Sequence, residues 1–598
     1  MTSPAEASGP THGEPDRSRL DDVAGVYSPE RPIGVAVRRV ARRGRPVWAG
    51  VVRCGRWFAR HHQLSFPGLV LGIGLLCMSL TPSLLPRTWL IQGMVSGLSM
   101  STGYGIGTAI GWPVRRLARV TPGPRVRRVA WWVLAALTLP SVGILLYQGS
   151  RWQRDLYRLM GDRPPTRPGY LRVILVIAAV FTAVVVVARC LRAAARELAR
   201  QFGRWVPARA SRAIGGVTVA LLSLGVLNTA VYDPLMSSAL SSSESVNDQM
   251  SPHVARPTSA GRSGSPESEV SWTSLGLQGR AFVAGGPTID QLREFNAAAP
   301  LPPIRVYAGR RSAPDSAAAA ALAVRELRRT GAFSRKVLCV ITTTGTGWVD
   351  PRAAEALEYL YNGDTALVAI QYSVLPSWLS FALERKKAEA AARELFDQVY
   401  AEWSRLPAAA RPKLLMFGES LGSLGGETAF AGIADLTRRV DGVLWAGPTQ
   451  ANALWSTLVA HRDPGTPQVR PVYEQGRTVW FADSVADLTG RPPWPAPRVV
   501  YLQHASDAAT WWTPELLVRR PDWLDEPRGR DVLPAMRWYP FVTFWQVTAD
   551  LAFADETPLG HGHRYGGEFA AAWAAIAPPT WWNARDTDRL VALIDSHG

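Results

Sequence analysis

Cysteine is scarce in this sequence, with four residues among 598, at positions 54, 77, 190 and 339. No two of them have C-x-x-C spacing. A small fold stapled by several disulfides is therefore excluded, as are a cysteine-based zinc site and a dithiol redox site. Cys339 lies inside the apolar stretch "KVLCVITTT" and is most simply a small buried strand residue.

Acidic residues are sparse in one part of the chain only. Residues 1–236 hold 31 Arg against 10 Asp and Glu, a net charge of +21, whereas residues 237–598 carry −3. A basic protein that binds nucleic acid gathers its cations on a soluble face. Here the arginines stand in blocks between long apolar runs, which is typical of a membrane domain. The charge pattern predicts two differently built parts and no nucleic-acid partner.

The N-terminal part contains five apolar runs of about the length that a bilayer-spanning helix needs, ~20 residues. They cover residues 67–85, 89–112, 129–148, 171–190 and 213–233. None carries an ionisable residue at mid-depth, which argues against a transport pathway. More than 60 residues precede the first run, so it is not a cleaved signal peptide. We predict an all-α transmembrane bundle of about five helices over residues 61–236.

The arginine-rich loops predict the orientation of these helices. Such loops precede the first run, follow the second and follow the fourth. With a largely disordered basic tail over residues 1–60, they would be cytoplasmic. The arginines of residues 151–172 oppose this assignment, although two aspartates dilute them. The prediction is a multi-pass protein of the cytoplasmic membrane whose domain after residue 233 is extracytoplasmic.

The second apolar run has glycines at GxxxG spacing, Gly93 with Gly97 and Gly107 with Gly111. Small residues at this spacing let two helix backbones approach closely. Packing within the bundle is the favoured interpretation. The alternative is a seam between two copies, which would give a homo-oligomer through the transmembrane helices.

Residues 237–270 are rich in Ser, Pro and Gly and poor in apolar side chains. Such a segment buries too little surface to offset the entropy lost on ordering. We therefore predict a flexible linker here, which joins the transmembrane domain to a soluble domain over residues 271–598.

The soluble part alternates short apolar strands with amphipathic helices. Strands are predicted at residues 303–309, 336–344, 365–372, 413–419, 442–447 and 498–504. Apolar strands separated by helices indicate a mostly parallel sheet with helices on both faces. The predicted fold class is α/β, of the α/β-hydrolase type.

The fourth of these strands runs into "FGESLGSLGGE", in which Gly418, Ser420 and Gly422 form a G-x-S-x-G motif. A serine on a sharp strand-to-helix turn has a strained backbone, and glycines two residues before and after relieve the crowding. The hydroxyl is then exposed at the edge of the sheet. Ser420 is the candidate nucleophile; the alternative is a glycine-rich turn that serves only helix–sheet packing.

A serine nucleophile needs a histidine base, and in this fold the base follows the acid in the chain. "TPLGHGHRYGGEF" puts His561 and His563 in a glycine-rich loop before a helix, where such a base belongs. His561 is preferred because it precedes a glycine, and His563 is the alternative. His504 lies in an apolar strand and is interpreted as structural.

The candidate acid is Asp507, just past the last predicted strand in "HASDAATWW". A carboxylate at a strand end can reach the loop that carries the base. Its rivals are Asp463, Asp483 and Asp550, each more simply a solvated loop or helix residue.

The negative charge of a tetrahedral intermediate requires backbone N–H donors. One is expected at Leu421, directly after the nucleophile, and another in the loop "ITTTGTGWVDP", where Gly345 and Thr346 are the candidates. A phosphate-binding interpretation of this loop fails because no G-K-[ST] follows. A plain β-to-α turn is the alternative.

Four stretches, "TTTGTGWVDP", "FGESLGSLGGE", "RDPGTPQVRPVYEQGR" and "HASDAATWW", occur here behind a multi-span N-terminal part. In this combination the chain resembles an actinobacterial membrane-anchored α/β-hydrolase family, over roughly residues 60 to 590. The resemblance implies an α/β-hydrolase catalytic domain with its own N-terminal transmembrane domain. It implies no particular substrate.

These features predict a serine esterase or lipase that acts through an acyl-enzyme on an acyl ester, an envelope lipid by its membrane setting. The alternative is an acyltransferase that passes the acyl group to a lipid or sugar hydroxyl. A third hypothesis is a non-catalytic membrane scaffold. No cofactor is expected, and no metal, because "HGH" at 561–563 has no third ligand at the usual spacing. Tryptophan-rich stretches at 448–497 and 511–545 predict a lid over an acyl pocket or aromatic rings at the membrane interface, and ordinary packing is the alternative.

Overall fold

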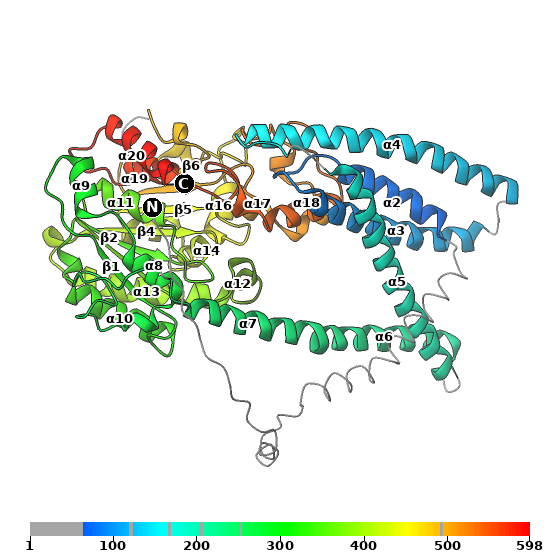
Figure 1. Cartoon of the computed structure of the whole chain (residues 1–598), viewed down its shortest axis with the longest axis horizontal. Helices are drawn as coiled ribbons and strands as arrows, with labels where there is room; N and C mark the ends of the chain where they lie inside the picture. Colours follow the sequence, from blue (N-terminus) through cyan, green and yellow to red (C-terminus); the bar gives the residue numbers. More distant parts are fainter. Residues whose placement is uncertain are drawn as a thin grey trace, which may run out of the picture. The chain divides into compact units, whose positions relative to one another are not determined.

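The computed structural model describes residues 64–597, apart from 119–122, 166–168, 204–206, 252–253 and 491–493. The tail predicted over residues 1–60 lies outside the described residues. Each of the five apolar runs contains a helix, although the helix in the first run ends at Ser79 and leaves residues 80–85 outside it (Figure 1). The N-terminal helices are α2 (Phe66–Ser79), α3 (Trp89–Ala118), α4 (Pro124–Leu159), α5 (Tyr170–Phe202), α6 (Ala208–Val226), a π-helical turn (Leu227–Tyr232) and α7 (Asp233–Asp248).

Two of these helices are long and apolar enough to cross a membrane. They span Pro124–Leu159 and Arg172–Phe202. The apolar segments Phe66–Ser79 and Ala213–Gly225 are shorter. A bilayer core is spanned by about 20 helical residues, so length and composition make Pro124–Leu159 and Arg172–Phe202 the membrane-spanning candidates.

Glycines bring α3 close to two of its neighbours. A Cβ at Gly93 would lie 2.5 Å from the Cβ of Val176 in α5, and one at Gly107 would lie 2.3 Å from the carbonyl oxygen of Pro67 in α2. Only glycine fits at such contacts. The two GxxxG pairs therefore pack inside the chain, as the favoured interpretation expects. A homo-oligomer through these helices remains a prediction.

The described residues of the linker predicted over 237–270, which are 237–251 and 254–270, form defined structure instead. Its first part belongs to α7, and its later part runs beside the first strand of the sheet. The N–H of Ser263 donates to the carbonyl of Arg305 over 3.1 Å, and the Ser263 hydroxyl accepts from the N–H of Tyr307 over 3.1 Å. Ser263 and Ser268 also donate to Glu326. The composition argument fails because this segment is ordered by hydrogen bonds to a strand edge and needs no core of its own.

Seven parallel strands form the sheet of the C-terminal domain, in the order β1-β3-β2-β4-β5-β7-β6. They are β1 (Ile304–Ala308), β2 (Val337–Thr342), β3 (Thr365–Ile370), β4 (Lys413–Glu419), β5 (Gly442–Ala446), β6 (Val479–Ala482) and β7 (Arg498–Leu502). Six of them match predicted strands. The seventh, β6, lies in a stretch predicted as a tryptophan-rich insertion. The predicted fold class is confirmed.

Helices cover both faces of the sheet (Figure 1). α10, α13 and α14 pack together on one face, and α11, α19 and α20 on the other. Their bounds are α10 (Ser316–Arg329), α11 (Pro351–Leu360), α13 (Arg385–Arg405), α14 (Leu421–Glu427), α19 (Glu568–Ile576) and α20 (Ala584–Ser596). The remaining helices are α8 (Gly276–Ala284), α9 (Ile289–Asn296), α12 (Ser377–Leu383), α15 (Ile433–Arg439), α16 (Ala453–Ala460), α17 (Ala508–Trp511) and α18 (Val542–Leu551).

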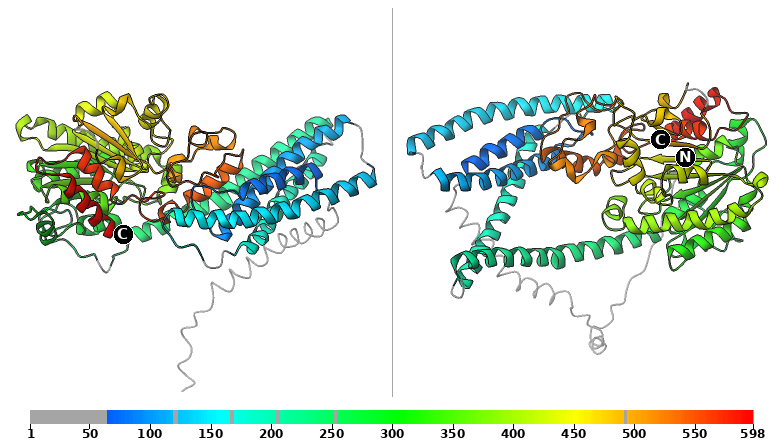
Figure 2. Two further views of the ribbon diagram at one scale, coloured as in Figure 1. Left: turned by 90° about the horizontal axis from the view of Figure 1, so that it is seen from above. Right: turned by 180° about the vertical axis from the view of Figure 1, so that it is seen from behind.

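Helix α18 lies beside α2 and α3 (Figure 2). The connection between α2 and α3 carries Arg87, whose guanidinium meets the carboxylate of Asp550 near the end of α18, with Nε 2.7 Å from Oδ1 and Nη2 3.2 Å from Oδ2. The N–H of Leu84 and the hydroxyl of Ser83 donate to the same carboxylate. Both charged side chains are fully buried, so this ion pair attaches α18 to the connection between α2 and α3.

Candidate active site

Ser420 occupies a sharp turn between β4 and α14. Its backbone has φ 54° and ψ −121°, a conformation that is costly for a residue with a side chain. A Cβ at Gly418 would lie 2.4 Å from Oγ1 of Thr342, and one at Gly422 would lie 2.2 Å from the carbonyl oxygen of Thr342. The glycine spacing is therefore required by the neighbouring strand β2, as the sequence predicts.

Hydrogen bonds hold this turn in place. The N–H of Ser420 donates to the carbonyl of Ala446 over 2.9 Å, and the hydroxyl of Thr342 donates to the carbonyl of Gly422 over 2.6 Å. The side chain of Ser420 is half-buried and lines a cavity of about 600 Å³. A serine hydroxyl is thus presented to a space large enough for a substrate.

Asp507 is buried at the start of α17, immediately beyond β7. Its Oδ2 lies 2.7 Å from Nδ1 of His563 and accepts from the hydroxyl of Tyr565 over 3.0 Å. Its Oδ1 accepts from the N–H of Ala509 over 2.8 Å. Because Nδ1 of His563 is engaged by the carboxylate, Nε2 is the ring nitrogen left for chemistry, and His563 lines the same cavity as Ser420.

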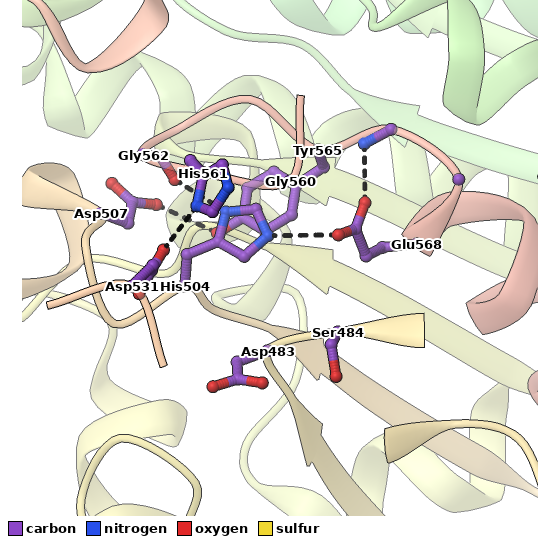
Figure 3. Close-up of polar contacts among 12 residues, drawn as sticks. Asp483, Ser484, His504, Asp507, Asp531, Gly560, His561, Gly562, Tyr565 and Glu568 are labelled. Atoms are coloured by element: carbon purple, nitrogen blue, oxygen red, sulfur yellow. Dashed lines mark hydrogen bonds and ion pairs between the residues drawn. The ribbon is translucent and has the colours of Figure 1, made fainter. Parts of the chain in front are cut away.

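The preference for His561 as the partner of Asp507 is wrong in the structure. Nδ1 of His561 lies 3.3 Å from Oδ2 of Asp531, and Figure 3 shows its ring turned toward that residue. Gly562, between the two histidines, has φ 57°. This left-handed residue turns the chain, so the side chains on either side of it reach different carboxylates. The candidate base is therefore His563, the alternative in the sequence-based prediction.

The charge of Asp507 acts directly on His563. Burial alone would lower the pKa of His563, but the adjacent carboxylate and its hydrogen bond outweigh burial and raise it above the ordinary value. An imidazolium at this position is thus stabilised. The same charge stabilises the imidazolium that forms when the neutral ring takes a proton from a serine hydroxyl, and only the neutral ring can accept that proton.

A second polar network holds the loop that carries His563 (Figure 3). Nδ1 of the fully buried His504 lies 2.9 Å from the carbonyl oxygen of Gly562, and its Nε2 faces Glu568 at 3.6 Å. On the other side, the N–H of Gly562 donates to the Ser506 hydroxyl over 2.8 Å, and Ser506 in turn donates to Asp531. Both the N–H and the carbonyl group of Gly562 are therefore held by hydrogen bonds.

Charge reinforces this network. Burial would lower the pKa of His504, but Glu568 raises it above its ordinary value. Burial would raise the pKa of Glu568, yet the contact with His504 lowers it to about 2. The two groups are mutually stabilised as an ion pair. His504 is structural, as predicted, but its role is to position the residue before His563.

Of the expected oxyanion donors, Leu421 directly follows the nucleophile in the chain, and Thr346 lines the same cavity. Leu421 begins α14, so its N–H has no partner within the helix. The loop after β2 folds into a turn in which Gly347 donates to the carbonyl of Thr344 over 2.9 Å. Among the described residues, no hydrogen bond is found for the N–H of Gly345 or Thr346. Thr346 lines the cavity, whereas Gly345 packs against residues 375–380.

Aromatic and carboxyl side chains line the rest of the cavity. The aromatic ones are Trp348, Trp378, Phe381, Trp512 and Tyr565, and the carboxyl ones are Asp350, Glu419 and Asp555. Of the tryptophans in the two stretches proposed as a lid, Trp512 alone lines this cavity, while Trp455, Trp511 and Trp523 are buried in the core. Ordinary packing thus accounts for most of those tryptophans.

Comparison with known proteins agrees with this geometry. Residues 304–590 match the model described as "Alpha/beta-hydrolase family", and residues 80–287 match the model described as "Alpha/beta-hydrolase family N-terminus". The chain belongs to this alpha/beta-hydrolase family. A comparison with curated proteins finds no match.

One residue of this alpha/beta-hydrolase site escaped the sequence-based prediction. Gly447 follows β5 with φ 53°, and a Cβ there would lie 2.2 Å from Cε1 of His563 and 3.1 Å from Oδ2 of Asp507. The pair of His563 and Asp507 therefore depends on a glycine at a third strand end. The sequence shows a glycine at the end of the predicted strand "GVLWAG". It does not show that the ring of His563 packs against that glycine, which is why a side chain cannot be accommodated there.

Proposed function

We propose that this alpha/beta-hydrolase is a membrane-anchored serine hydrolase of the esterase or lipase type, acting on an acyl ester through an acyl-enzyme. One observation carries the proposal: Ser420, on a strained strand-to-helix turn, lines the same cavity as His563. Nδ1 of His563 is bound to the buried carboxylate of Asp507, which leaves Nε2 for the serine. Proton transfer to a positioned histidine is what makes a serine hydroxyl nucleophilic at neutral pH.

The proposed reaction proceeds in two halves. Oγ of Ser420 attacks the ester carbonyl carbon while Nε2 of His563 accepts the hydroxyl proton. The N–H of Leu421 and an N–H of the loop after β2 stabilise the resulting oxyanion. As the ester C–O bond breaks, His563 returns its proton to the leaving alcohol. Water then attacks the acyl carbon while His563 accepts a proton from it, and His563 passes that proton to Oγ of Ser420 as the acyl–Oγ bond breaks, which releases the acid and regenerates Ser420.

The membrane setting favours a lipid as the ester. Two helices of the N-terminal part have the length and hydropathy of membrane spans. Helix α18, which contacts the N-terminal helices, ends at Leu551, and Leu551 lines the cavity. An active site coupled in this way to an anchor would receive its substrate from the bilayer, with the catalytic domain on the outer side of the cytoplasmic membrane.

Labelling with a fluorophosphonate probe tests the nucleophile. The wild-type protein, purified in detergent, should be labelled, and Ser420→Ala should not. Ser423→Ala, which changes a buried serine in the helix that directly follows Ser420, is the matched control and should keep the label. Continued labelling of Ser420→Ala would remove Ser420 from the nucleophile role.

The substrate and the acceptor need a separate experiment. Envelope lipids from cells that carry the wild-type protein are compared with those from cells that carry Ser420→Ala. An ester that accumulates only with Ser420→Ala identifies the substrate. Product analysis with and without an added acceptor alcohol then separates hydrolysis from acyl transfer, because both share the acyl-enzyme and differ only in the group that attacks it.

A further inference from the structure

Buried glutamates in the described part of the chain are matched by hydrogen-bond donors, with one exception. Glu358 receives two bonds of 2.7 Å from Arg305, and Glu427 accepts from Asn452 over 3.0 Å. Glu419 is 3% exposed, and among the described residues its Oε2 has no partner. A buried acceptor left without a donor is unfavourable, so a carboxyl group kept in this state indicates an absent ligand.

The position of Glu419 identifies where this ligand would bind. It is the last residue of β4, directly before Ser420, and it lines the 600 Å³ cavity. The leaving alcohol of an ester takes its proton from His563, which lines the same cavity. Glu419 therefore borders the cavity in which a substrate attached to Ser420 would lie.

The neighbours of Glu419 determine its ionisation. Burial is the main cause that raises its pKa well above the ordinary value, and the charges of Asp350, Asp555 and Asp507 raise it further, while His563 acts in the opposite direction. Glu419 is thus held as a neutral carboxyl group. In that form it can donate one hydrogen bond and accept others, which suits a hydroxyl or ether oxygen.

The rest of the cavity wall suits the same chemistry. Nε of Arg352, which also lines the cavity, is a second buried donor without a partner among the described residues. Trp348, Trp378 and Trp512 offer aromatic surface to the apolar faces of a ligand. Polar groups that fix orientation on an apolar wall are typical of a small-molecule site. A strongly anionic ligand is disfavoured because carboxyl groups outnumber arginines in the lining.

We propose that this wall of the cavity is a subsite for a polyhydroxy alcohol, glycerol-like or sugar-like, which forms the alcohol part of the ester, and that Glu419 donates a hydrogen bond to one of its oxygens. The proposal rests on the proposed function, because it assigns the substrate class of that same site. It names Glu419 as a residue that contacts substrate, and it adds no covalent step.

Three esters of one acyl chain test the subsite in the full-length protein: octanoylglycerol, ethyl octanoate and octanoylglycerol phosphate. The wild-type protein should hydrolyse octanoylglycerol with a kcat/KM roughly 10-fold or more above that of ethyl octanoate, because a site built to bind a hydroxyl rejects an analogue without it. Octanoylglycerol phosphate should be a poorer substrate than octanoylglycerol.

Two substitutions at Glu419 separate hydrogen bonding from packing. Glu419→Gln keeps a neutral donor of the same shape and should keep the preference within about threefold. Glu419→Leu has no donor and should lower kcat/KM for octanoylglycerol by about 10- to 100-fold, more than for ethyl octanoate. Glu427→Gln is the matched control: a buried glutamate outside the cavity, whose replacement should leave the substrate preference unchanged.

The pH dependence supplies a readout that loss of folding would not mimic. An ionised carboxylate cannot donate, so the wild-type preference for octanoylglycerol should decline at alkaline pH, whereas that of Glu419→Gln should not. Equal kcat/KM for octanoylglycerol and ethyl octanoate, or a preference for the phosphate ester, would overturn the subsite while the serine hydrolase stands. Absence of both ester hydrolysis and Ser420 labelling would remove the proposed function and the subsite together.

Discussion

Arg87 and Asp550, 463 residues apart in the sequence, form a buried ion pair between the α2–α3 connection and helix α18. The arginine also donates to the carbonyl of Gln546 over 3.1 Å. Leu551, the residue after Asp550, lines the cavity. Asp550, which binds the N-terminal part of the chain, is thus adjacent in sequence to a residue that lines the candidate active site.

We predict that Asp550→Asn or Arg87→Met lowers the free energy of unfolding by about 3–5 kcal/mol, because each leaves a buried charge without its partner. Thermal unfolding of the full-length protein in detergent measures this. The control is the exposed pair of Arg293 and Asp290, which should contribute about 0–1 kcal/mol. Equal effects at the two pairs would mean that the buried contact does not hold α18.

The choice between the two histidines gives a second prediction. His563→Ala should lower turnover by about 10⁴- to 10⁶-fold, because it removes the group that accepts the proton of Ser420. His561→Ala should cost far less, because His561 contacts Asp531 and not Asp507. Hydrolysis of a short p-nitrophenyl ester measures both. A loss of the larger size in His561→Ala alone would reverse the assignment.

The strand-to-helix turn of Ser420 and the acid Asp507 could be predicted from the sequence because their causes are local. Gly418 and Gly422 are required by the turn that they flank, and Asp507 follows an apolar strand whose end is visible in the sequence. The histidine could not be chosen, because His561 and His563 are two residues apart and the left-handed Gly562 decides which carboxylate each one reaches.

Features that depend on a distant partner were beyond sequence reasoning. The order of residues 254–270 comes from pairing with β1, to which Ser263 contributes, and composition alone indicated a flexible segment. The role of Gly447 depends on the ring of His563, over a hundred residues later in the chain. The local sequence predicted which types of residue the site needs, whereas tertiary packing determines which individual residues of each type contact one another.

Gly447 gives a third prediction. Gly447→Ala should lower turnover by roughly 10²-fold, because the added methyl group must displace the ring of His563 from its position. Gly331→Ala is a matched control, since Gly331 also has a positive φ, 68°, but no atom within 4 Å of the added Cβ. Both variants should lose a similar amount of stability, about 1 kcal/mol, from backbone strain. Turnover that falls equally in both would show that strain, and not the position of His563, is responsible.

The ion pair of His504 and Glu568 gives a fourth prediction, on pH. The pKa of Glu568 is lowered to about 2, so its contribution to stability is present above its unfolded pKa, about 4.3, and is lost as the pH falls toward 2. The pKa of His504 is raised, so its contribution is present below its unfolded pKa, about 6.5, and is lost as the pH rises through the folded value. The pair therefore stabilises the fold most between about pH 4.3 and 6.5.

Glu568→Gln removes the charge of this pair and keeps an acceptor for the N–H of Gly566, which Glu568 binds at 2.9 Å. The difference in Tm between wild-type protein and Glu568→Gln should be largest within that pH window and shrink on either side of it. The corresponding difference in the free energy of unfolding should be on the order of 2–3 kcal/mol at the maximum, from a pKa shift of roughly two units. A difference that does not vary with pH would mean that the pair is held by packing and not by charge. In that case the loop around Gly562 would keep its shape without the ion pair, and the turnover of Glu568→Gln would equal that of the wild type across the whole range.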